Sequence, residues 1–460
     1  MRIFRLSISI AFVFPVFFLV YRVCTVVWAE QSVGRRKRLF DVLTVELVFC
    51  IFDFLIYQRL VGFAHLDNRW PVLPLLPRRV AGGRRPVNLC ADCVKATLLA
   101  SLLGAHLAFV FFHVRLESSV GSAEPHWFAL ACFLALGFYL HLGPLLVVVV
   151  VLETTVAPWL NRFVPRRRLF DVLLRKRRIH TGASLAAAAL FSALCVRTAL
   201  RPPVVVTTHV HLDDLPKEFD GFRIALLTDV HIGPTVGRKK VVEMVDLVNL
   251  QRPDVVALSG DIVDGEESHW AKSVEPLRDL NAPHGSYYST GNHEYYHGNI
   301  NQWIKILERN GVTALRNANV RLRRHAWSSA SVCLAGVDDM TAAASGVHGH
   351  GMNVSAALAS CDQRYPTVML IHQPNGVRAA VEDELSRRRR IDLVLAGHTH
   401  GGQFYTAFLV AYLLNAYFVG LYRHPSGTQV YVSPGVNYWG PPMKIAGMSE
   451  VSLIVLKRAH

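Results

Sequence analysis

The chain has 460 residues, of which 52% are hydrophobic, and its mean hydropathy is positive. This length allows two or three domains, but the composition is too apolar for an ordinary soluble enzyme. A wholly soluble globular protein is therefore excluded as the starting hypothesis, and a membrane portion is indicated.

The formal net charge of +15 arises entirely in the first half of the chain. Residues 1–209 hold 25 Lys and Arg against 10 Asp and Glu, whereas residues 210–460 hold 24 of each. A nucleic-acid-binding protein would carry its basic surface on a folded domain. Here the arginines lie between hydrophobic stretches, so we interpret them as topology determinants and lipid-headgroup contacts, and we expect no nucleic-acid partner.

Five hydrophobic stretches approach or exceed the roughly 20 residues that a helix needs to cross a bilayer. They predict an α-helical polytopic membrane domain over residues 1–205. The first stretch lacks a clean cleavage site, so we interpret it as a retained anchor and not as a secretory signal. The predicted spans are residues 6–28, 42–60, 96–114, 127–152 and, more weakly, 179–200.

From Pro202 onward, short β-rich runs alternate with amphipathic stretches, which is typical of a layered α/β domain. We therefore predict a second domain over residues 206–460. With five spans, 17 Lys and Arg fall on the side of the N-terminus and 7 on the other side. Because these residues collect on the cytoplasmic side, the count places the second domain outside the cell or in a lumen. If one of the five spans is wrongly predicted, the second domain would face the cytosol instead.

Three smaller features depend on these interpretations. Asn353-Val354-Ser355 is a glycosylation sequon, which is relevant only to a lumenal domain. Glu46 and Asp53 lie seven residues apart on one face of the second span, where interhelical ion pairing is favoured over a transport or lipid-substrate role. The cysteines form no disulfide framework, and we interpret most of them as buried thiols; a redox pair or half of a zinc site at Cys90 and Cys93 is the less favoured alternative. The eight are Cys24, Cys50, Cys90, Cys93, Cys132, Cys195, Cys333 and Cys361.

Five apolar strands in the second domain are each predicted to end in residues that can bind a metal ion. Any one of these motifs alone is adequately explained as a capped turn or a surface histidine. Five in succession at strand ends indicate a metal site at the rim of a sheet, where carboxylates and imidazoles can point at one ion. The runs are Asp229-Val230-His231, Gly260-Asp261-Ile262-Val263-Asp264, Gly291-Asn292-His293-Glu294, the lone His372, and Gly397-His398-Thr399-His400.

In this order, D-x-H, G-D-x-x-D, G-N-H-E, a lone His and G-H-T-H resemble the signature of the calcineurin-like metallophosphoesterase superfamily, over about residues 220–455. The runs 336–339, 397–403 and 432–442 resemble its branch that contains bacterial membrane-associated phosphoesterases. The resemblance implies a layered α/β/β/α sandwich. It also implies one metal ion held by Asp229, His231, Asp261 and His400, and a second held by Asp261, Asn292, His372 and His398, with Asp261 bridging them.

Two divalent ions roughly 3.5 to 4 Å apart can lower the pKa of a shared water to near neutrality and stabilise the oxygens of an in-line displacement at phosphorus. Aspartate and neutral histidine suit manganese, iron or zinc, and manganese is our expectation. The resemblance further implies that His293 is the general acid that protonates the leaving oxygen, oriented by Asp264. The alternative is a structural histidine with satisfied hydrogen bonds.

The leading hypothesis is a membrane-tethered, multi-pass hydrolase of a phosphomonoester, phosphodiester or pyrophosphate bond that uses metal-activated water. Its substrate would be a phosphorylated small molecule or a lipid-linked compound near the bilayer. The alternative is a transporter- or receptor-like membrane protein whose phosphoesterase fold serves as a ligand-binding module. The complete set of candidate ligands disfavours that alternative.

Overall fold

The computed structural model describes residues 123–156, 177–296, 299–382 and 390–459, together with residues 103–108 and the single positions 49, 53, 55, 56, 59 and 159. The predicted span over residues 6–28 lies outside the described residues, as do Glu46 and the Cys90–Cys93 pair. The predicted spans over residues 42–60 and 96–114 lie mostly outside them.

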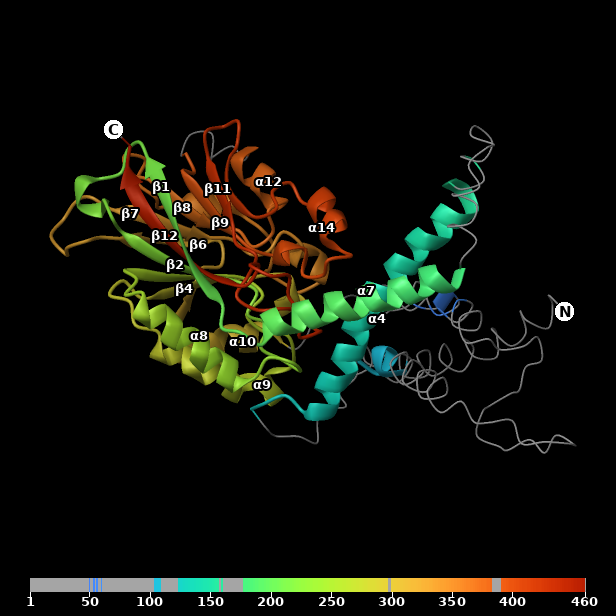
Figure 1. The fold of residues 1–460 in the computed structure, drawn as a ribbon. Coiled ribbons are helices and arrows are strands. Elements are labelled where there is room, and N and C mark those ends of the chain that lie inside the picture. The colour runs from blue at the N-terminus through green and yellow to red at the C-terminus, as the bar shows by residue number, and fades with distance from the viewer. Residues whose placement is uncertain are drawn as a thin grey trace, which may run out of the picture.

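Among the described residues, two helical stretches are long and apolar enough to cross a membrane. Helix α4 (Trp127–Val151) continues into the π-helical turn η2 (Leu152–Val156), and helix α7 (Arg177–Ala199) leads into the rest of the fold. The two helices cross each other beside the remainder of the molecule (Figure 1). They coincide with the fourth and fifth predicted spans. The polytopic membrane domain as a whole stays a prediction.

Several polar groups among the described residues of this helical part are paired with one another. The carboxylate of Glu153 accepts two hydrogen bonds from the guanidinium of Arg59, and Nδ1 of His180 lies 2.8 Å from it. Asp53 lies 2.9 Å from Nε2 of His106, a pairing between segments distant in sequence. Such pairing is what ionisable side chains among apolar helices require.

Residues 204–458 form a mixed α/β fold, which we call the α/β region, and it contains two six-stranded sheets. The first has the order β1 (Val204–Leu212), β12 (Glu450–Arg458), β2 (Arg223–Leu227), β3 (Val255–Ser259), β4 (Ser286–Ser289) and β5 (Val312–Ala314). The second has the order β10 (Gly420–Arg423), β11 (Gln429–Val432), β9 (Leu393–Ala396), β8 (Thr367–Leu370), β7 (Val332–Gly336) and β6 (Ala318–Leu322). The neighbouring strands β2 to β5 run parallel, as do β7, β8, β9 and β11, so their carboxyl ends share an edge.

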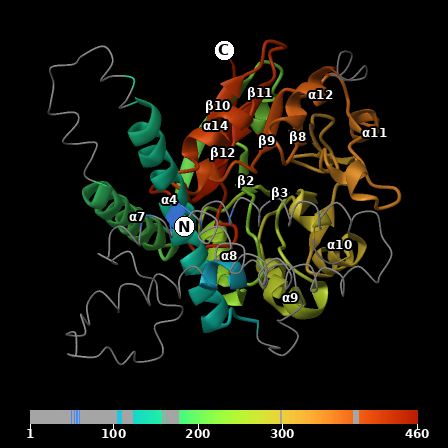
Figure 2. The same cartoon turned by 90° about the vertical axis from the view of Figure 1, so that its right-hand side faces the viewer.

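Helices cover the outer face of each sheet (Figures 1 and 2). Those of the first sheet are α8 (Arg238–Leu250), α9 (Glu267–Val274) and α10 (Ile300–Arg309); those of the second are α11 (Val354–Leu358) and α12 (Gly376–Glu382). Helix α14 (Phe408–Leu414) lies apart from these, on the side where α4 and α7 extend. The shorter turns are η3 (Lys217–Phe219), η4 (Glu275–Asp279), η5 (His293–Tyr295), η6 (Ala342–Ser345) and η7 (His400–Gly402).

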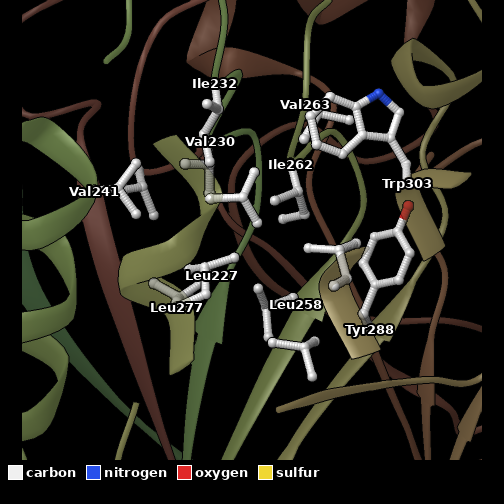
Figure 3. Packing of buried hydrophobic residues seen from close by; sticks show 14 of the residues in the cluster. Leu227, Val230, Ile232, Val241, Leu258, Ile262, Val263, Leu277, Tyr288 and Trp303 are labelled. Carbon is white, nitrogen blue, oxygen red and sulfur yellow. The ribbon is translucent and has the colours of Figure 1, made fainter. Parts of the chain in front are cut away.

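Three hydrophobic clusters hold these layers together. One lies between the sheets, where Leu226 and Ala257 of the first meet Leu370 and Leu395 of the second. Another joins the first sheet to its helices, with residues of α8 and α10 packed over Leu227, Leu258 and Tyr288 (Figure 3). The third joins the second sheet to α11 and α12. Strands β2 and β3 are buried on both faces, which explains their continuous apolar sequences.

Cys333 of β7 and Cys361, three residues beyond α11, form a disulfide bond with a Cα–Cα distance of 5.6 Å. The expectation of mostly buried thiols is wrong for this pair. A separation of 28 residues gives no sign that these segments lie side by side. Cys132 and Cys195 are buried free thiols, as predicted.

Candidate metal centre

The predicted site residues lie just beyond the carboxyl ends of five strands that come from both sheets. Contacts link seven of them directly, as described below, and the backbone N–H of His398 donates to the carboxylate of Asp229 at 3.0 and 3.2 Å. The ninth, Asn292, precedes His293, whose backbone N–H donates to Asp261 at 2.9 Å. By strand, Asp229 and His231 follow β2, Asp261 and Asp264 follow β3, Asn292 and His293 follow β4, His372 follows β8, and His398 and His400 follow β9.

Five of the seven candidate metal ligands have a positive φ angle, although none is glycine. This left-handed conformation costs of order 1–3 kcal/mol per residue and persists only where the surrounding structure enforces it, typically at functional sites. All five residues lie within four positions of the end of a strand. The five are Asp229 (56°), His231 (51°), Asp261 (54°), His398 (71°) and His400 (52°).

The first group of ligand atoms comprises Asp229, His231 and His400. Nε2 of His231 lies 3.0 Å from Nε2 of His400, which in turn lies 3.2 Å from Oδ1 of Asp229. Ligand atoms that share one ion at roughly 2.0–2.2 Å lie about 3 Å apart when they subtend a right angle. The spacing of these atoms therefore fits a single divalent ion.

The second group comprises Asp261, His372 and His398. Nδ1 of His372 contacts the carbonyl oxygen of Ser259 at 2.8 Å and can only donate to it, so Nε2 is the nitrogen that carries the lone pair when the imidazole is neutral. That Nε2 lies 3.0 Å from Oδ2 of Asp261 without the geometry of a hydrogen bond. Among the described residues, the buried Oδ1 of Asn292 also has no hydrogen-bond partner. Lone pairs directed at one another fit a cation between them.

Asp261 lies between the two groups. Its Oδ2 is 3.0 Å from His372, 3.8 Å from Nε2 of His231 and 3.9 Å from Nε2 of His293. The side chain is 1% exposed. A carboxylate in this position can contribute to both groups at once.

The buried charges of the cluster shift the pKa values of its members in different directions, and burial outweighs the carboxylates at His398 and His400, whose pKa values are lowered. Burial raises the pKa of Asp261, but His372 and His293 outweigh burial and hold this pKa well below its usual range. Burial lowers the pKa of a histidine, yet Asp264 and Asp229 raise that of His231 to about 10. Burial also opposes the charge on His372, but Asp261 raises its pKa well above the ordinary value. The buried carboxylates thus produce a potential that attracts cations.

Asp264 contacts two histidines. Its Oδ1 lies 2.6 Å from Nδ1 of His293, and its Oδ2 lies 3.2 Å from Nδ1 of His231. Burial would raise the pKa of Asp264, but His293 and His231 hold it well below the usual range. From the sequence we expected Asp264 to orient His293, and its contact with His231, a candidate metal ligand, was not foreseen.

Sequence reasoning overlooked the role of Glu294, the last residue of the G-N-H-E motif. Its buried carboxylate accepts hydrogen bonds from the backbone N–H groups of Asp261, Ile262, Val263 and Gly291, at 2.6 to 3.2 Å. One side chain thereby fixes the turns after β3 and β4 relative to each other. Its place in the motif was the available signal.

Lys444 was also overlooked. Its side chain is fully buried, and Nζ donates to the carbonyl oxygens of Pro434 and Asn437 at 2.7 and 2.5 Å. Nζ also lies 3.4 Å from Nδ1 of His400. Burial lowers the pKa of Lys444 to about 7. A lone lysine in the otherwise uncharged run 441–448 was the only signal in the sequence.

Two aromatic side chains border the site on its exposed side. The rings of Tyr296 and Trp439 have centroids 4.9 and 5.4 Å from that of His293, and both side chains are 40% exposed. The amide of Gln403 fixes the backbone of Trp439, because Oε1 accepts from its N–H and Nε2 donates to its carbonyl oxygen. The loop after His400 is thus joined to the rim of the site.

Comparison with known proteins agrees with this geometry. The calcineurin-like phosphoesterase family matches residues 222–402. The chain is 36% identical over 383 residues to the zebrafish transmembrane protein with metallophosphoesterase domain, which covers 83% of this chain and 84% of that protein. The bovine protein of that name is 36% identical over 376 residues, covering 81% and 82%. A Helicobacter pylori metallophosphoesterase is 36% identical over 257 residues, covering 56% and 65%.

The names of the vertebrate relatives and the two apolar helices together support membrane association of the chain. The family match covers the strand-end motifs from Asp229 to His400. The similarity to the vertebrate relatives extends over more than four fifths of the chain. The chain therefore belongs to the calcineurin-like metallophosphoesterase superfamily.

Proposed function

We propose that the chain is a membrane-tethered phosphoric ester hydrolase that uses two divalent metal ions. The observation that carries this proposal is the position of Asp261, whose carboxylate lies within 4 Å of His231, His293 and His372 at the meeting point of two ligand groups. Asp229, His231, Asp261 and His400 would hold one ion. Asp261, Asn292, His372 and His398 would hold the other.

Two ions in these positions would supply the charge that lowers the pKa of a nucleophilic water and neutralises a phosphoryl group. The chain itself supplies positioning and proton transfer. Asp264 holds Nδ1 of His293 at 2.6 Å, which leaves Nε2 directed into the site to protonate the leaving oxygen. Glu294 fixes the turns that carry Asp261 and Asn292.

The donor set of carboxylate, amide and imidazole groups suits manganese, with iron or zinc as alternatives. A site made only of oxygen ligands would have favoured magnesium or calcium. The substrate class that we propose is a phosphomonoester, phosphodiester or pyrophosphate on a small molecule or a lipid-linked compound.

For the membrane arrangement we propose a multi-pass domain over residues 1–205 and an extracytoplasmic catalytic domain over residues 206–460. Eight Lys and Arg lie from Arg162 to Arg178, in the connection after α4 and the first residues of α7, and they favour a cytosolic position for that connection. The α/β region follows the opposite end of α7. The Cys333–Cys361 disulfide and the exposed Asn353 sequon both suit an oxidising, lumenal or extracellular compartment.

Hydrolysis of p-nitrophenyl phosphate and bis-p-nitrophenyl phosphate by the purified full-length chain with manganese tests the proposal. We expect activity in the natural chain and its loss in Asp261→Asn. The matched control is Asp246→Asn, because Asp246 is an exposed carboxylate on α8. This variant should retain activity. Equal rates for the natural chain and Asp261→Asn, or no activity with manganese, iron or zinc, would favour the ligand-binding alternative instead.

A further inference from the structure

Helix α14 is a short, wholly apolar helix with none of its seven residues buried. Leu409 is 63% exposed, and Leu413 and Leu414 are each 70% exposed. The sequence from Phe404 to Gly420 contains no charged side chain. A helix that is apolar all round is normally enclosed by protein or by lipid, and contiguous exposed patches of this kind mark an interaction surface.

The helix is attached to the α/β region at Phe408, at Tyr412 and at the carbonyl group of its last residue. The rings of Phe408 and Tyr412 contact that of Phe418, with centroids 5.1 and 5.6 Å apart. The side-chain amide of Asn375 donates to the carbonyl oxygen of Leu414 at 3.1 Å. Leu409 and Leu413, four residues apart on the helix, are therefore held in an outward orientation.

The segment before α14 connects it to both candidate membrane helices. Thr406 Oγ1 donates to the carbonyl oxygen of Leu140 in α4 at 2.9 Å. The ring of Tyr405 contacts that of Phe191 in α7, with centroids 5.1 Å apart. In both views α14 lies on the side of the α/β region from which α4 and α7 extend (Figures 1 and 2). The exposed face of α14 thus continues an apolar surface formed by two helices that can cross a bilayer.

The same segment reaches the candidate metal centre. Phe408, the first residue of α14, lies only eight positions after His400. Gln403, between them, fixes the backbone of Trp439, whose ring borders His293. An apolar surface therefore begins at the rim of the site.

We propose that α14 is embedded in the bilayer that α4 and α7 cross, and that the site hydrolyses a phosphate ester carried by a lipid of that leaflet. The second half rests on the proposed phosphoesterase function. Lipid is favoured over a protein partner because the segment that leads into α14 contacts two helices apolar enough to cross a bilayer, and no charged side chain lies between Phe404 and Gly420. Burial of an apolar helix face at the boundary of headgroups and acyl chains is a known mode of membrane attachment.

Photo-crosslinking tests the position of α14 without reference to catalysis. A diazirine amino acid replaces Leu413 in the full-length chain, which is then reconstituted in phosphatidylcholine nanodiscs and irradiated. We expect mass spectrometry to find adducts with phospholipid acyl chains. The matched control carries the same amino acid in place of Leu250, which is 75% exposed. Leu250 is the last residue of α8, and the opposite end of that helix contacts α7. We expect no lipid adduct at this position. Adducts with another segment or a second copy of the chain, or no lipid adducts at position 413, would overturn the proposal.

A substrate comparison tests the second half. In the double variant Leu409→Gln and Leu413→Gln, we expect hydrolysis of phosphatidic acid or phosphatidylglycerol in nanodiscs to fall at least tenfold, while hydrolysis of p-nitrophenyl phosphate stays within twofold. Leu250→Gln should change neither rate. If the double variant loses activity equally on both substrates, or loses none on the lipid, the proposal of a lipid substrate is overturned. It is also overturned if the natural chain hydrolyses p-nitrophenyl phosphate but neither lipid. A natural chain inactive on every substrate that still gives lipid adducts would instead overturn the proposed function.

Discussion

Nδ1 of His293 lies 2.6 Å from Oδ1 of Asp264, while Nε2 on the opposite edge of the ring lies 3.9 Å from Oδ2 of Asp261. The first contact fixes the orientation of the ring, and the second directs its free nitrogen toward the candidate metal centre. We expect a histidine held in this way to serve in proton transfer.

His293→Gln should impair the release of poor leaving groups most strongly. General acid catalysis contributes roughly 10²- to 10⁴-fold, so we expect kcat for an alkyl phosphate to fall by about that factor. Hydrolysis of p-nitrophenyl phosphate should fall less, because p-nitrophenolate leaves without a proton. Steady-state kinetics on both substrates measure the difference. Equal losses on the two would assign His293 to another role.

Lys444→Met should weaken metal binding while leaving the fold intact. Nζ of Lys444 connects two backbone carbonyl groups to the imidazole of His400, and loss of such an outer contact typically lowers metal affinity 10- to 100-fold. Calorimetric titration with manganese measures the change in metal affinity. The matched control is Lys240→Met, because Lys240 also donates to a backbone carbonyl, that of Ala199, but contacts no candidate ligand. Similar losses in both variants would show a general effect of removing a buried amine.

Gly397→Ala should disturb the site by overlap. A Cβ atom at this position would overlap Oγ1 of Thr228 and Oδ2 of Asp229, so the Asp229 carboxylate must move. We expect metal content to fall by about half. Gly311→Ala is the control, because no atom lies within 4 Å of its Cβ position and its φ of 78° strains only the backbone. That variant should lose stability without losing metal; retention of metal by Gly397→Ala would contradict the expected displacement.

The sequence predicted the mixed α/β fold and the gathering of strand-end residues because both depend on local patterns. Apolar runs such as Val255–Ser259 identify buried strands, and polar residues that follow parallel strands share one edge of a sheet. The roles of these residues, as seven metal ligands and as the general acid His293, stay predictions. What the pattern supplied was their proximity.

Other features depend on long-range packing that no local pattern encodes. Strand β12, the last of the fold, inserts between β1 and β2 near the start of the α/β region, and it follows the loop that places Lys444 beside His400. The Cys333–Cys361 bond likewise joins segments whose adjacency arises only after folding. Helix α14 was missed because seven apolar residues are too few to predict a span.

The compartment can be tested through Asn353 and the disulfide. We expect the chain from eukaryotic cells to shift in mobility after endoglycosidase treatment, and Ser355→Ala, which removes the sequon but keeps the Asn353 side chain that caps α11, to abolish the shift. Mass spectrometry of unreduced peptides should recover Cys333 linked to Cys361. Recovery of both cysteines as free thiols would place the α/β region in a reducing compartment.

Metal content of the purified full-length chain tests the central claim most directly. After incubation with manganese and removal of free metal, we expect elemental analysis to find about two ions per chain, fewer than one in Asp261→Asn, and about two in Asp246→Asn. A natural chain that retains no manganese, iron or zinc, or an Asp261→Asn variant that retains as much metal as the natural chain, would contradict a two-metal centre bridged by Asp261.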